Sequence, residues 1–257
     1  MILRRLSQSL KEQNWTAIWI EFILLVTGVF LGIQVSNWNA ARVEQRRADE
    51  LFIRLIGDLE SEINNVDALQ AYYLTTATYA KVALSEFEAP GSVDAETFVI
   101  SAYQASQWQE AASSRSTFDE IVATGAVNLV RTEKARNLLI AYYEFDWTDA
   151  LTVTSRPHYR ELMRGVMPYP VQEAIKSACG DQVRRTGRAN LTWLPRTCDI
   201  DLPAEDIERA AAALRAAPGM EQALRYQLAE NDTKAANYAS TRKQIVPIVA
   251  AIKEGVR

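Results

Sequence analysis

The side chains that most often carry chemistry are few in this sequence and lie far apart. His158 is the only histidine, and it follows a proline in the run SRPHYREL. A zinc site needs three or four nitrogen, sulfur or carboxylate ligands, and no Glu-x-x-His arrangement accompanies this histidine. Glycine-rich phosphate loops and Gly-x-Ser-x-Gly nucleophile turns are also missing from the sequence. We therefore expect no enzyme, no metal site and no cofactor, and we interpret His158 as part of a turn or a helix start.

The two cysteines are better suited to structure than to nucleophilic catalysis. Cys179 and Cys198 enclose a polar segment that is rich in turn-forming residues. Such a pair predicts a disulfide if the compartment is oxidising, whereas two free thiols are the alternative. Closing a loop of about 20 residues would stabilise the fold by ~3 kcal/mol.

Two groups of charged residues could recognise ions or partners. The acidic group consists of Asp58, Glu60 and Glu62. We interpret it as a solvated face, with a cation-binding edge as the alternative. The basic group lies inside the cysteine loop and consists of Arg184, Arg185 and Arg188. It is either a solvated loop or a docking patch for an acidic partner or a lipid surface. No basic stripe interleaved with aromatic residues is present, so we expect no nucleic-acid partner.

One apolar stretch near the N-terminus is long enough to span a membrane. Residues 16–35 read TAIWIEFILLVTGVFLGIQV, and about 20 helical residues span the ~30 Å of a hydrocarbon core. Tryptophans flank the stretch on both sides, as expected for interface anchors: Trp15, Trp19 and Trp38. A cleaved signal peptide is the rival interpretation, but its apolar region is shorter and precedes a small-x-small cleavage site. We therefore predict an uncleaved membrane anchor.

The anchor divides the chain into three predicted parts. Residues 1–14 form a short tail, 15–38 the transmembrane helix and 39–257 an exported domain. Basic residues are nearly balanced on the two sides of the span, so the positive-inside rule does not fix the orientation. A disulfide requires the large domain to lie outside the cytoplasm. We therefore expect the N-terminus in the cytoplasm and the domain outside it.

Small and charged residues inside the span indicate a contact surface. Gly28 and Gly32 form a small-xxx-small pair, which Thr27 extends, and Glu21 lies just inside the hydrocarbon. Helices associate in lipid through close backbone packing, because no hydrophobic force draws them together there. A carboxylate at the bilayer centre costs about 2.5–3.5 kcal/mol, and less near one end. Packing against another transmembrane helix is one interpretation. Glycines that face lipid, with Glu21 reaching to the interface, are the other.

The stretch IEFILLVTGVFLGIQVSNWN, residues 20–39, resembles the opening of a family of uncharacterised bacterial single-span membrane proteins. In that family an acidic residue, here Glu21, opens the apolar run and Asn-Trp-Asn, here residues 37–39, closes it. The stretch STFDEIVATGAVNLVRTEKARNLLIAYYE, residues 116–144, is also similar. Ala40 departs from the pattern, since an acidic residue is common there. The likeness covers about a third of the chain and implies a bacterial envelope protein. It implies no activity. With the orientation expected from the cysteines, the anchor would lie in the inner membrane and the domain in the periplasm.

Beyond the span the apolar residues follow a helical spacing at both ends of the domain. The first seam comprises Phe52, Ile56, Leu59, Ile63, Val66, Gln70, Tyr73, Ala77, Ala80, Leu84 and Phe87, with Leu55 and Leu69 widening it. The second comprises Leu224, Leu228, Asn231, Ala235, Tyr238, Arg242, Ile245, Val249 and Ile252. Two long seams predict two helices that pair antiparallel, completed to a bundle by shorter helices between them. The expected fold class is all-α, with the loop 179–198 closed by the cysteines.

These features predict an assembly role rather than a reaction. The leading hypothesis is a single-span accessory or scaffold subunit of a larger bacterial inner-membrane complex, of respiratory or photosynthetic type. Its partners would be other transmembrane subunits and the bilayer, and its domain would brace the periplasmic face of the complex. The alternative is a periplasmic ligand-binding sensor or adaptor that acts through a membrane partner. Polar residues within the seams, which include Asn231, would then line a ligand pocket instead of setting the register.

Overall fold

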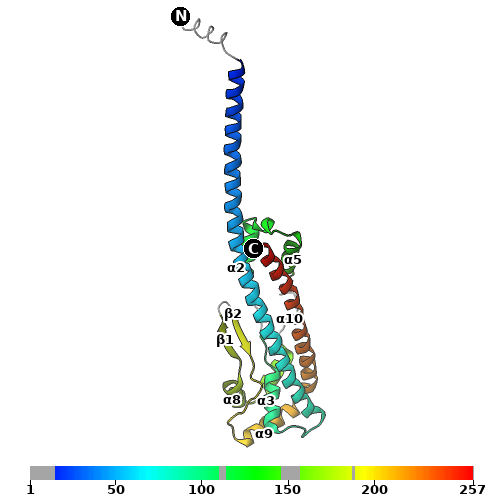
Figure 1. The fold of residues 1–257 in the computed structure, drawn as a ribbon. Helices are drawn as coiled ribbons and strands as arrows, with labels where there is room; N and C mark the ends of the chain where they lie inside the picture. The colour runs from blue at the N-terminus through cyan, green and yellow to red at the C-terminus, as the bar shows by residue number, and fades with distance from the viewer. Residues whose placement is uncertain (1–14, 110–113, 146–156, 187–188, 257) are drawn as a thin grey trace. The chain divides into compact units, whose positions relative to one another are not determined.

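The computed structural model describes residues 15–109, 114–145, 157–186 and 189–256 (Figure 1). It is almost wholly helical, with a single two-stranded sheet among the described residues. The predicted all-α class is therefore confirmed. The chain divides into two units, residues 1–51 and 52–257, and the first helix, α2, supplies residues to both. The predicted tail, 1–14, lies outside the described residues.

Helix α2 extends from Trp15 to Glu88 without interruption. The sequence predicts this continuity, because no glycine–proline break separates the apolar stretch from the first seam. The helix ends one residue before Ala89-Pro90-Gly91, where the break is predicted. Gly91 has φ +85°, a conformation that glycine adopts at low cost, and it turns the chain away from the helix.

The last helix, α10 (Met220–Val256), pairs antiparallel with the Phe52–Glu88 part of α2 (Figure 1). The ion pairs between the two helices set the register: Glu60 with Lys253, Asp67 with Arg242 and Glu88 with Arg225. In these three pairs the residue number on α10 falls as the residue number on α2 rises, so the two helices run in opposite directions. The predicted pairing of the two long helices is thus confirmed.

The buried stripe of α2 is wider than the predicted seam. Phe52, Leu59, Val66, Tyr73, Ala77 and Ala80 are buried as expected, but the other seam positions are only partly buried. The residues that precede four of these positions are buried instead: Leu55, Leu69, Ala83 and Glu86. A helix that is covered from more than one side buries a broad stripe, whereas a two-stranded coil buries a narrow one. Full burial of a leucine such as Leu55 stabilises the fold by roughly 1.5–3 kcal/mol.

Shorter helices build the main core with the C-terminal end of α2 and the start of α10. They are α3 (Ala95–Ala105), α7 (His158–Val166), α8 (Tyr169–Cys179) and α9 (Ala204–Ala216). Phe98, Tyr159 and Leu214 are among the residues that this core buries completely or almost so. The sequence predicts α8 and α9 close to their observed bounds. It misses α7, because the prolines on either side of this helix suggested an irregular segment.

The sequence predicts that a helix starts at Thr132, and it predicts a capping box with Ser116 at the N-cap and Asp119 three residues on. Thr132 caps α5 (Glu133–Glu144), in agreement with the predicted start, since its hydroxyl accepts from the Ala135 N–H at 3.2 Å. The predicted capping box at Ser116 does not form, because Ser116 is already the first residue of α4 (Ser116–Ala123). A residue with helical φ and ψ no longer presents its side chain to the free N–H groups of the next turn. The prediction that α5 continues to residue 155 was wrong, because the helix ends at Glu144 and Phe145 has extended backbone; residues 146–155 lie outside the described part of the chain.

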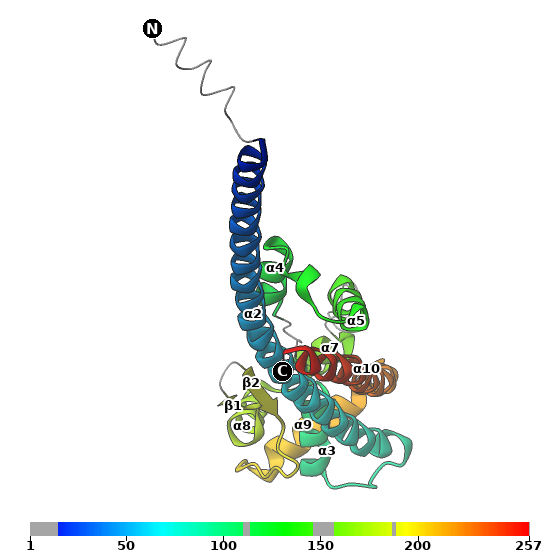
Figure 2. The same ribbon diagram turned by 45° about the horizontal axis from the view of Figure 1, so that its top comes forward.

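Helices α4 and α5 lie on α2 and α10 at one end of the second unit (Figure 2). A short 3-10 turn, η1 (Ala126–Leu129), joins them after Gly125, whose φ of +73° agrees with the predicted left-handed glycine. The rings of Phe118 and Tyr143 stack with centroids 4.2 Å apart, which holds α4 against α5.

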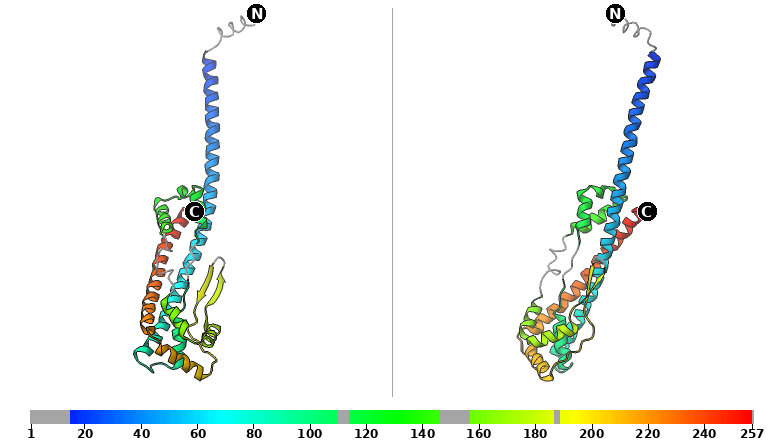
Figure 3. Two further views of the ribbon diagram at one scale, coloured as in Figure 1. Left: turned by 180° about the vertical axis from the view of Figure 1, so that it is seen from behind. Right: turned by 90° about the vertical axis from the view of Figure 1, so that its left-hand side faces the viewer.

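The cysteine loop contains the only strands of the described chain, β1 (Gln182–Thr186) and β2 (Ala189–Trp193). They pair antiparallel, with Val183 opposite Thr192 and Arg185 opposite Asn190. The hairpin and α10 lie on opposite sides of the second half of α2, as the front and back views show (Figures 1 and 3). The sequence predicts only an irregular loop here. Two five-residue runs containing valine, threonine and tryptophan, separated by a two-residue Gly-Arg link, were the missed hairpin signal.

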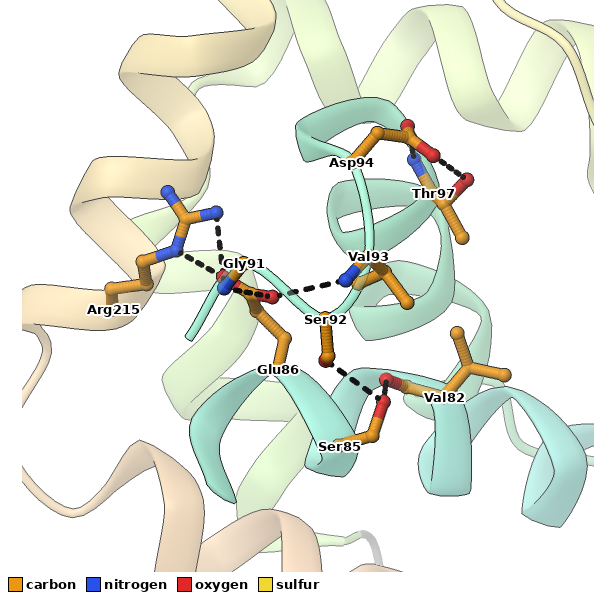
Figure 4. A network of polar contacts seen from close by, with 9 residues as sticks. All are labelled: Val82, Ser85, Glu86, Gly91, Ser92, Val93, Asp94, Thr97 and Arg215. Atoms are coloured by element: carbon orange, nitrogen blue, oxygen red, sulfur yellow. Dashed lines mark hydrogen bonds and ion pairs between the residues drawn. The ribbon is translucent and has the colours of Figure 1, made fainter. Parts of the chain in front are cut away.

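The turn from α2 to α3 is organised around one buried carboxylate, Glu86, which is 1% exposed (Figure 4). Its oxygens accept from the Gly91 N–H at 3.0 and 3.1 Å and from the Val93 N–H at 3.3 Å. Arg215 of α9 adds an ion pair at 2.9 Å. The N-cap of α3 follows directly, where Asp94 accepts from the Thr97 N–H at 2.8 Å. Glu86 thus links two helices and the turn between them.

Candidate functional site

The apolar part of α2 exposes every residue that the structure describes with its side chain between positions 19 and 44. This helix is the only one among the described residues that is long and apolar enough to cross a membrane. Leu24 and Leu25 are 66% and 67% exposed, which is far more than a helix inside a soluble core would show. The finding is consistent with a membrane anchor.

The predicted packing residues of this segment fall largely on one face. Seven residues make about two helical turns and four make about one, so Glu21, Gly28 and Gly32 lie along one side. Thr27 lies about 100° around the helix from Gly28, so it borders this face instead of extending its line. A Cβ built on either glycine meets no atom within 4 Å, so packing among the described residues gives no reason for a glycine there.

The aromatic residues that flank the segment interact with their helical neighbours. The Trp19 ring meets the Phe22 ring edge-on at 6.0 Å, and the Arg42 guanidinium lies over the Trp38 ring at 4.1 Å. Trp19 and Trp38 are exposed, as interface anchors must be. Trp15 is the first residue of α2, and its side chain lies outside what the structure describes.

Cys179 and Cys198 form the predicted disulfide, with Cα atoms 5.5 Å apart. The bond joins the end of α8 to the segment after β2 and therefore closes the base of the hairpin.

The predicted basic patch is less concentrated than the sequence suggests. Arg184 and Arg185 are successive residues of a strand, so their side chains leave opposite faces of the hairpin. Arg188 lies outside the described residues, so the docking role of this group stays a prediction.

The acidic group on α2 is engaged with neighbouring elements. Asp58 and Glu62 are half-buried, so their interpretation as part of a solvated face was wrong, whereas Glu60 is exposed as that interpretation expects. Asp58 accepts from the Thr117 hydroxyl of α4. Glu62 accepts from the Tyr142 hydroxyl of α5 at 2.7 Å, and Glu60 pairs with Lys253 of α10. Burial, and then the negative charge of Glu62, raises the pKa of Tyr142 well above its ordinary range, so this phenol stays a donor. The three carboxylates are attachment points for three helices.

His158 is the first residue of α7 and is exposed, which agrees with the predicted helix start. Among the described residues, no group of three or more histidine, cysteine or carboxylate side chains is arranged to hold a metal ion.

A second polar site lies within the bundle, around Tyr72 and Tyr73 of α2. Tyr72 donates to Asp181 at 2.9 Å, and the amide of Gln109 donates to the same carboxylate at 2.6 Å. The Tyr73 hydroxyl donates to the Gln109 carbonyl at 2.7 Å and accepts from the Gln109 N–H at 3.1 Å. Burial raises the pKa of both phenols well above the ordinary value, so both remain protonated.

Two arginines of α7 donate hydrogen bonds to residues next to this polar site. Arg160 donates to the Ser106 carbonyl at 2.8 Å and to the Gln107 side-chain oxygen at 3.2 Å. Arg164 donates to the same Gln107 oxygen at 3.1 Å and lies over the Tyr103 ring. Burial, and then the neighbouring Arg164, lowers the pKa of Arg160. The neutral side-chain oxygen of Gln107 thus accepts hydrogen bonds from both arginines.

Helix α10 closes the site with three side chains that each have one buried polar atom without a hydrogen-bond partner among the described residues. The Lys234 ammonium lies 5.3 Å from the centre of the Tyr73 ring, and the Tyr238 ring stacks on Tyr73 at 5.8 Å. Asn231 is one turn before Lys234, and its oxygen accepts from Gln227 at 2.8 Å. The three atoms without a partner in the described part of the chain are Lys234 Nζ, Asn231 Nδ2 and the Tyr238 hydroxyl. The sequence singles out Asn231 as a polar residue in the seam but misses Lys234, which lies one position outside it.

No protein-family model, no curated protein and no solved structure matches this chain.

Proposed function

We propose that this protein is a non-catalytic, single-span accessory subunit that docks into a larger membrane complex through its N-terminal helix. The observation that carries the proposal is the face formed by Glu21, Gly28 and Gly32 on a helix exposed along its apolar length. Two glycines in a helix cost roughly 1 kcal/mol each relative to alanine. The packing of the described residues does not require them, because the space above both is open. A neighbouring transmembrane helix that approaches the backbone closely would account for them.

The same proposal accounts for Glu21. A carboxylate inside the hydrocarbon needs a partner, a proton or access to the interface, and a partner helix supplies the first of these. Glu21 lies two turns from Gly28 on the same side of the helix, so a single partner would cover both.

The second unit would act outside the cytoplasm, as a brace on the outer surface of the complex. The disulfide of Cys179 and Cys198 supports an oxidising compartment, since such bonds rarely persist in the cytosol. The resemblance to bacterial single-span proteins points to the periplasm and hence to an N-terminus in the cytoplasm. A respiratory or photosynthetic complex is the kind of host that we propose.

Purification in mild detergent tests the docking role. The protein should migrate in a stoichiometric complex with other membrane proteins. Replacing both glycines, Gly28→Leu with Gly32→Leu, should release it from that complex. The matched control is Val29→Leu with Ile33→Leu, which changes exposed apolar residues of the same turns. Retention of the double glycine variant in the complex would refute the proposal.

A second candidate function is a ligand-binding sensor or adaptor whose site lies in the bundle. One specific observation favours it, namely the three hydrogen-bond donors of α10 that lack a partner beside Tyr73. Buried polar groups in folded proteins are almost always hydrogen-bonded, so each exception calls for an explanation. Such a sensor or adaptor would act through a membrane partner. A lone homodimer that carries a bound small molecule would favour this function over docking.

A further inference from the structure

The unpartnered atoms of α10 share a chemical type. Lys234 Nζ and Asn231 Nδ2 are donors without acceptor capacity, and the Tyr238 hydroxyl has a proton to donate. Asn231 is completely buried, and Lys234 and Tyr238 are only 1% and 5% exposed. Water therefore does not reach them freely. This part of the core has a surplus of donors over acceptors.

The acceptors around Tyr73 that the structure describes are already engaged. The Tyr73 hydroxyl and the Gln109 carbonyl satisfy each other, as described above. Asp181 holds Tyr72 and the Gln109 amide, and the Gln107 oxygen holds two arginines. Among the described residues, none of these acceptors is hydrogen-bonded to the donors of α10. An acceptor from outside the described chain would satisfy them.

The charge around Lys234 indicates an anion. The Lys234 ammonium contacts a tyrosine ring and has no carboxylate hydrogen-bonded to it. Burial lowers the pKa of Lys234, and the negative charge of Glu230, one turn earlier on α10, acts in the opposite direction. A buried ammonium that is not hydrogen-bonded to a counter-ion is strongly unfavourable, and a bound anion offsets that cost.

The surroundings narrow the class of anion. Lys234 supplies one cation, and the amide of Asn231 and the hydroxyl of Tyr238 are neutral donors. A single carboxylate matches this set of three side chains. Tyr73 and Tyr238 belong to a buried cluster with Val66, Leu69 and Leu194, so the rest of the ligand meets rings and aliphatic side chains.

We propose that Lys234, Asn231 and Tyr238 form a binding site for a small aromatic or apolar monocarboxylate beside Tyr73. Lys234 binds the carboxylate through its charge, and the amide and hydroxyl orient it. The proposal rests on the ligand-binding alternative and not on membrane docking. The two are tested by different variants, because the glycine face and Lys234 belong to separate parts of the chain.

The test uses the full-length protein in detergent, with acetate, butyrate and benzoate as probes. Binding is measured by equilibrium dialysis and by the midpoint of thermal unfolding. Benzoate should bind most tightly of the three, since its ring adds apolar contact. Benzamide, which has the same shape without the charge, should bind at least about tenfold more weakly, because hydrogen bonds to charged groups contribute about 1.5–3 kcal/mol.

Variants of α10 connect the binding to these residues. Lys234→Met should weaken benzoate binding by at least about tenfold. Tyr238→Phe, which keeps the stacked ring, should weaken it about fivefold by removing one neutral hydrogen bond. Lys243→Met is the matched control, because Lys243 lies exposed on the same helix, and its affinity should equal that of the wild type. If Lys234→Met fails to fold, the proposal is tested by comparing the benzoate affinity of Tyr238→Phe with that of the wild type.

Three results would overturn the proposal. One is that none of the three carboxylates binds or raises the unfolding midpoint. Another is that benzoate binds equally well to the wild type and to the Lys234 and Tyr238 variants. The third is that inorganic phosphate binds more tightly than benzoate.

Discussion

Glu86 offers the sharpest test of how the second unit is held together. The substitution Glu86→Gln keeps the size of the side chain and removes its charge. It replaces one oxygen by an NH2 group that faces either the N–H groups of Gly91 and Val93 or the guanidinium of Arg215, so one of these donors loses its acceptor. The ion pair with Arg215 is weakened at the same time. Unfolding should therefore become easier, although the buried volume is unchanged.

The magnitude follows from these contacts. A buried donor left without a partner costs about 1–3 kcal/mol, and a hydrogen bond to a charged group contributes about 1.5–3 kcal/mol. Arg215 is 35% exposed and Gly91 is exposed, so water compensates part of the loss. We expect a loss of about 2–3 kcal/mol in the free energy of unfolding. For a unit of this size that corresponds to roughly 4–12 °C in the unfolding midpoint.

The assay is thermal unfolding of the full-length protein in detergent, followed by tryptophan fluorescence. Glu88→Gln is the matched control, because Glu88 lies in the same helical turn with its side chain 54% exposed and its ion pair to Arg225 at 3.5 Å. An exposed pair of this kind contributes less than ~1 kcal/mol. Equal losses in the two variants would refute the role assigned to Glu86.

Lowering the pH should remove the difference in the free energy of unfolding between the wild type and Glu86→Gln. Burial acts to raise the pKa of Glu86, but the hydrogen bonds from Gly91 and Val93 and the charge of Arg215 outweigh it and lower the pKa. A carboxylate with a lowered pKa stabilises the fold above its unfolded-state pKa, about 4.3, and loses this contribution as the pH falls through the folded value. The difference between wild type and Glu86→Gln should be constant near neutrality and should shrink below about pH 4. A difference that persists at low pH would contradict this explanation.

Two further predictions concern the same unit. Replacing Cys179 and Cys198 by serine should lower the free energy of unfolding by about 3 kcal/mol, because the unfolded chain loses a closed loop. A reducing agent should lower the unfolding midpoint of the wild type to that of the double variant, and no change on reduction would contradict the prediction. Leu139→Ala, at a completely buried position of α5, should cost about 2–5 kcal/mol in denaturant unfolding, whereas Val122→Ala at an exposed position of α4 should cost less than about 0.5 kcal/mol. Similar costs for the two would show that α5 is not part of the folded core.

The long-range architecture could be predicted because it rests on periodic signals. The seams that begin at Phe52 and Leu224 repeat over many turns, so they specify two long helices and their pairing. The centre of the buried stripe could not be fixed to one residue. Leu55 and Ile56 are both apolar, and the helices that cover α2 decide which of them is buried.

Features that depend on tertiary contacts were harder to predict from the sequence. Glu86 and Lys234 are charged residues next to apolar seams, and a charge in such a place usually indicates a solvated position. Their burial follows from partners far away in the sequence, Arg215 for Glu86 and the Tyr73 ring for Lys234. The membrane face was predictable as a pattern of residue types, because Glu21, Gly28 and Gly32 repeat at helical spacing. What covers that face remains a prediction.

Cross-linking from the apolar part of α2 tests the proposed docking of this helix most directly. A photoreactive residue is placed at Leu25, which lies on the face of Gly28 and Gly32, or at Phe30, which lies roughly opposite. Both positions are exposed, so the two probes differ in the direction they face. Irradiation of cells should give one defined protein adduct from position 25 and none from position 30. Adducts of equal yield from both positions, or no adduct from position 25, would contradict a dedicated docking face.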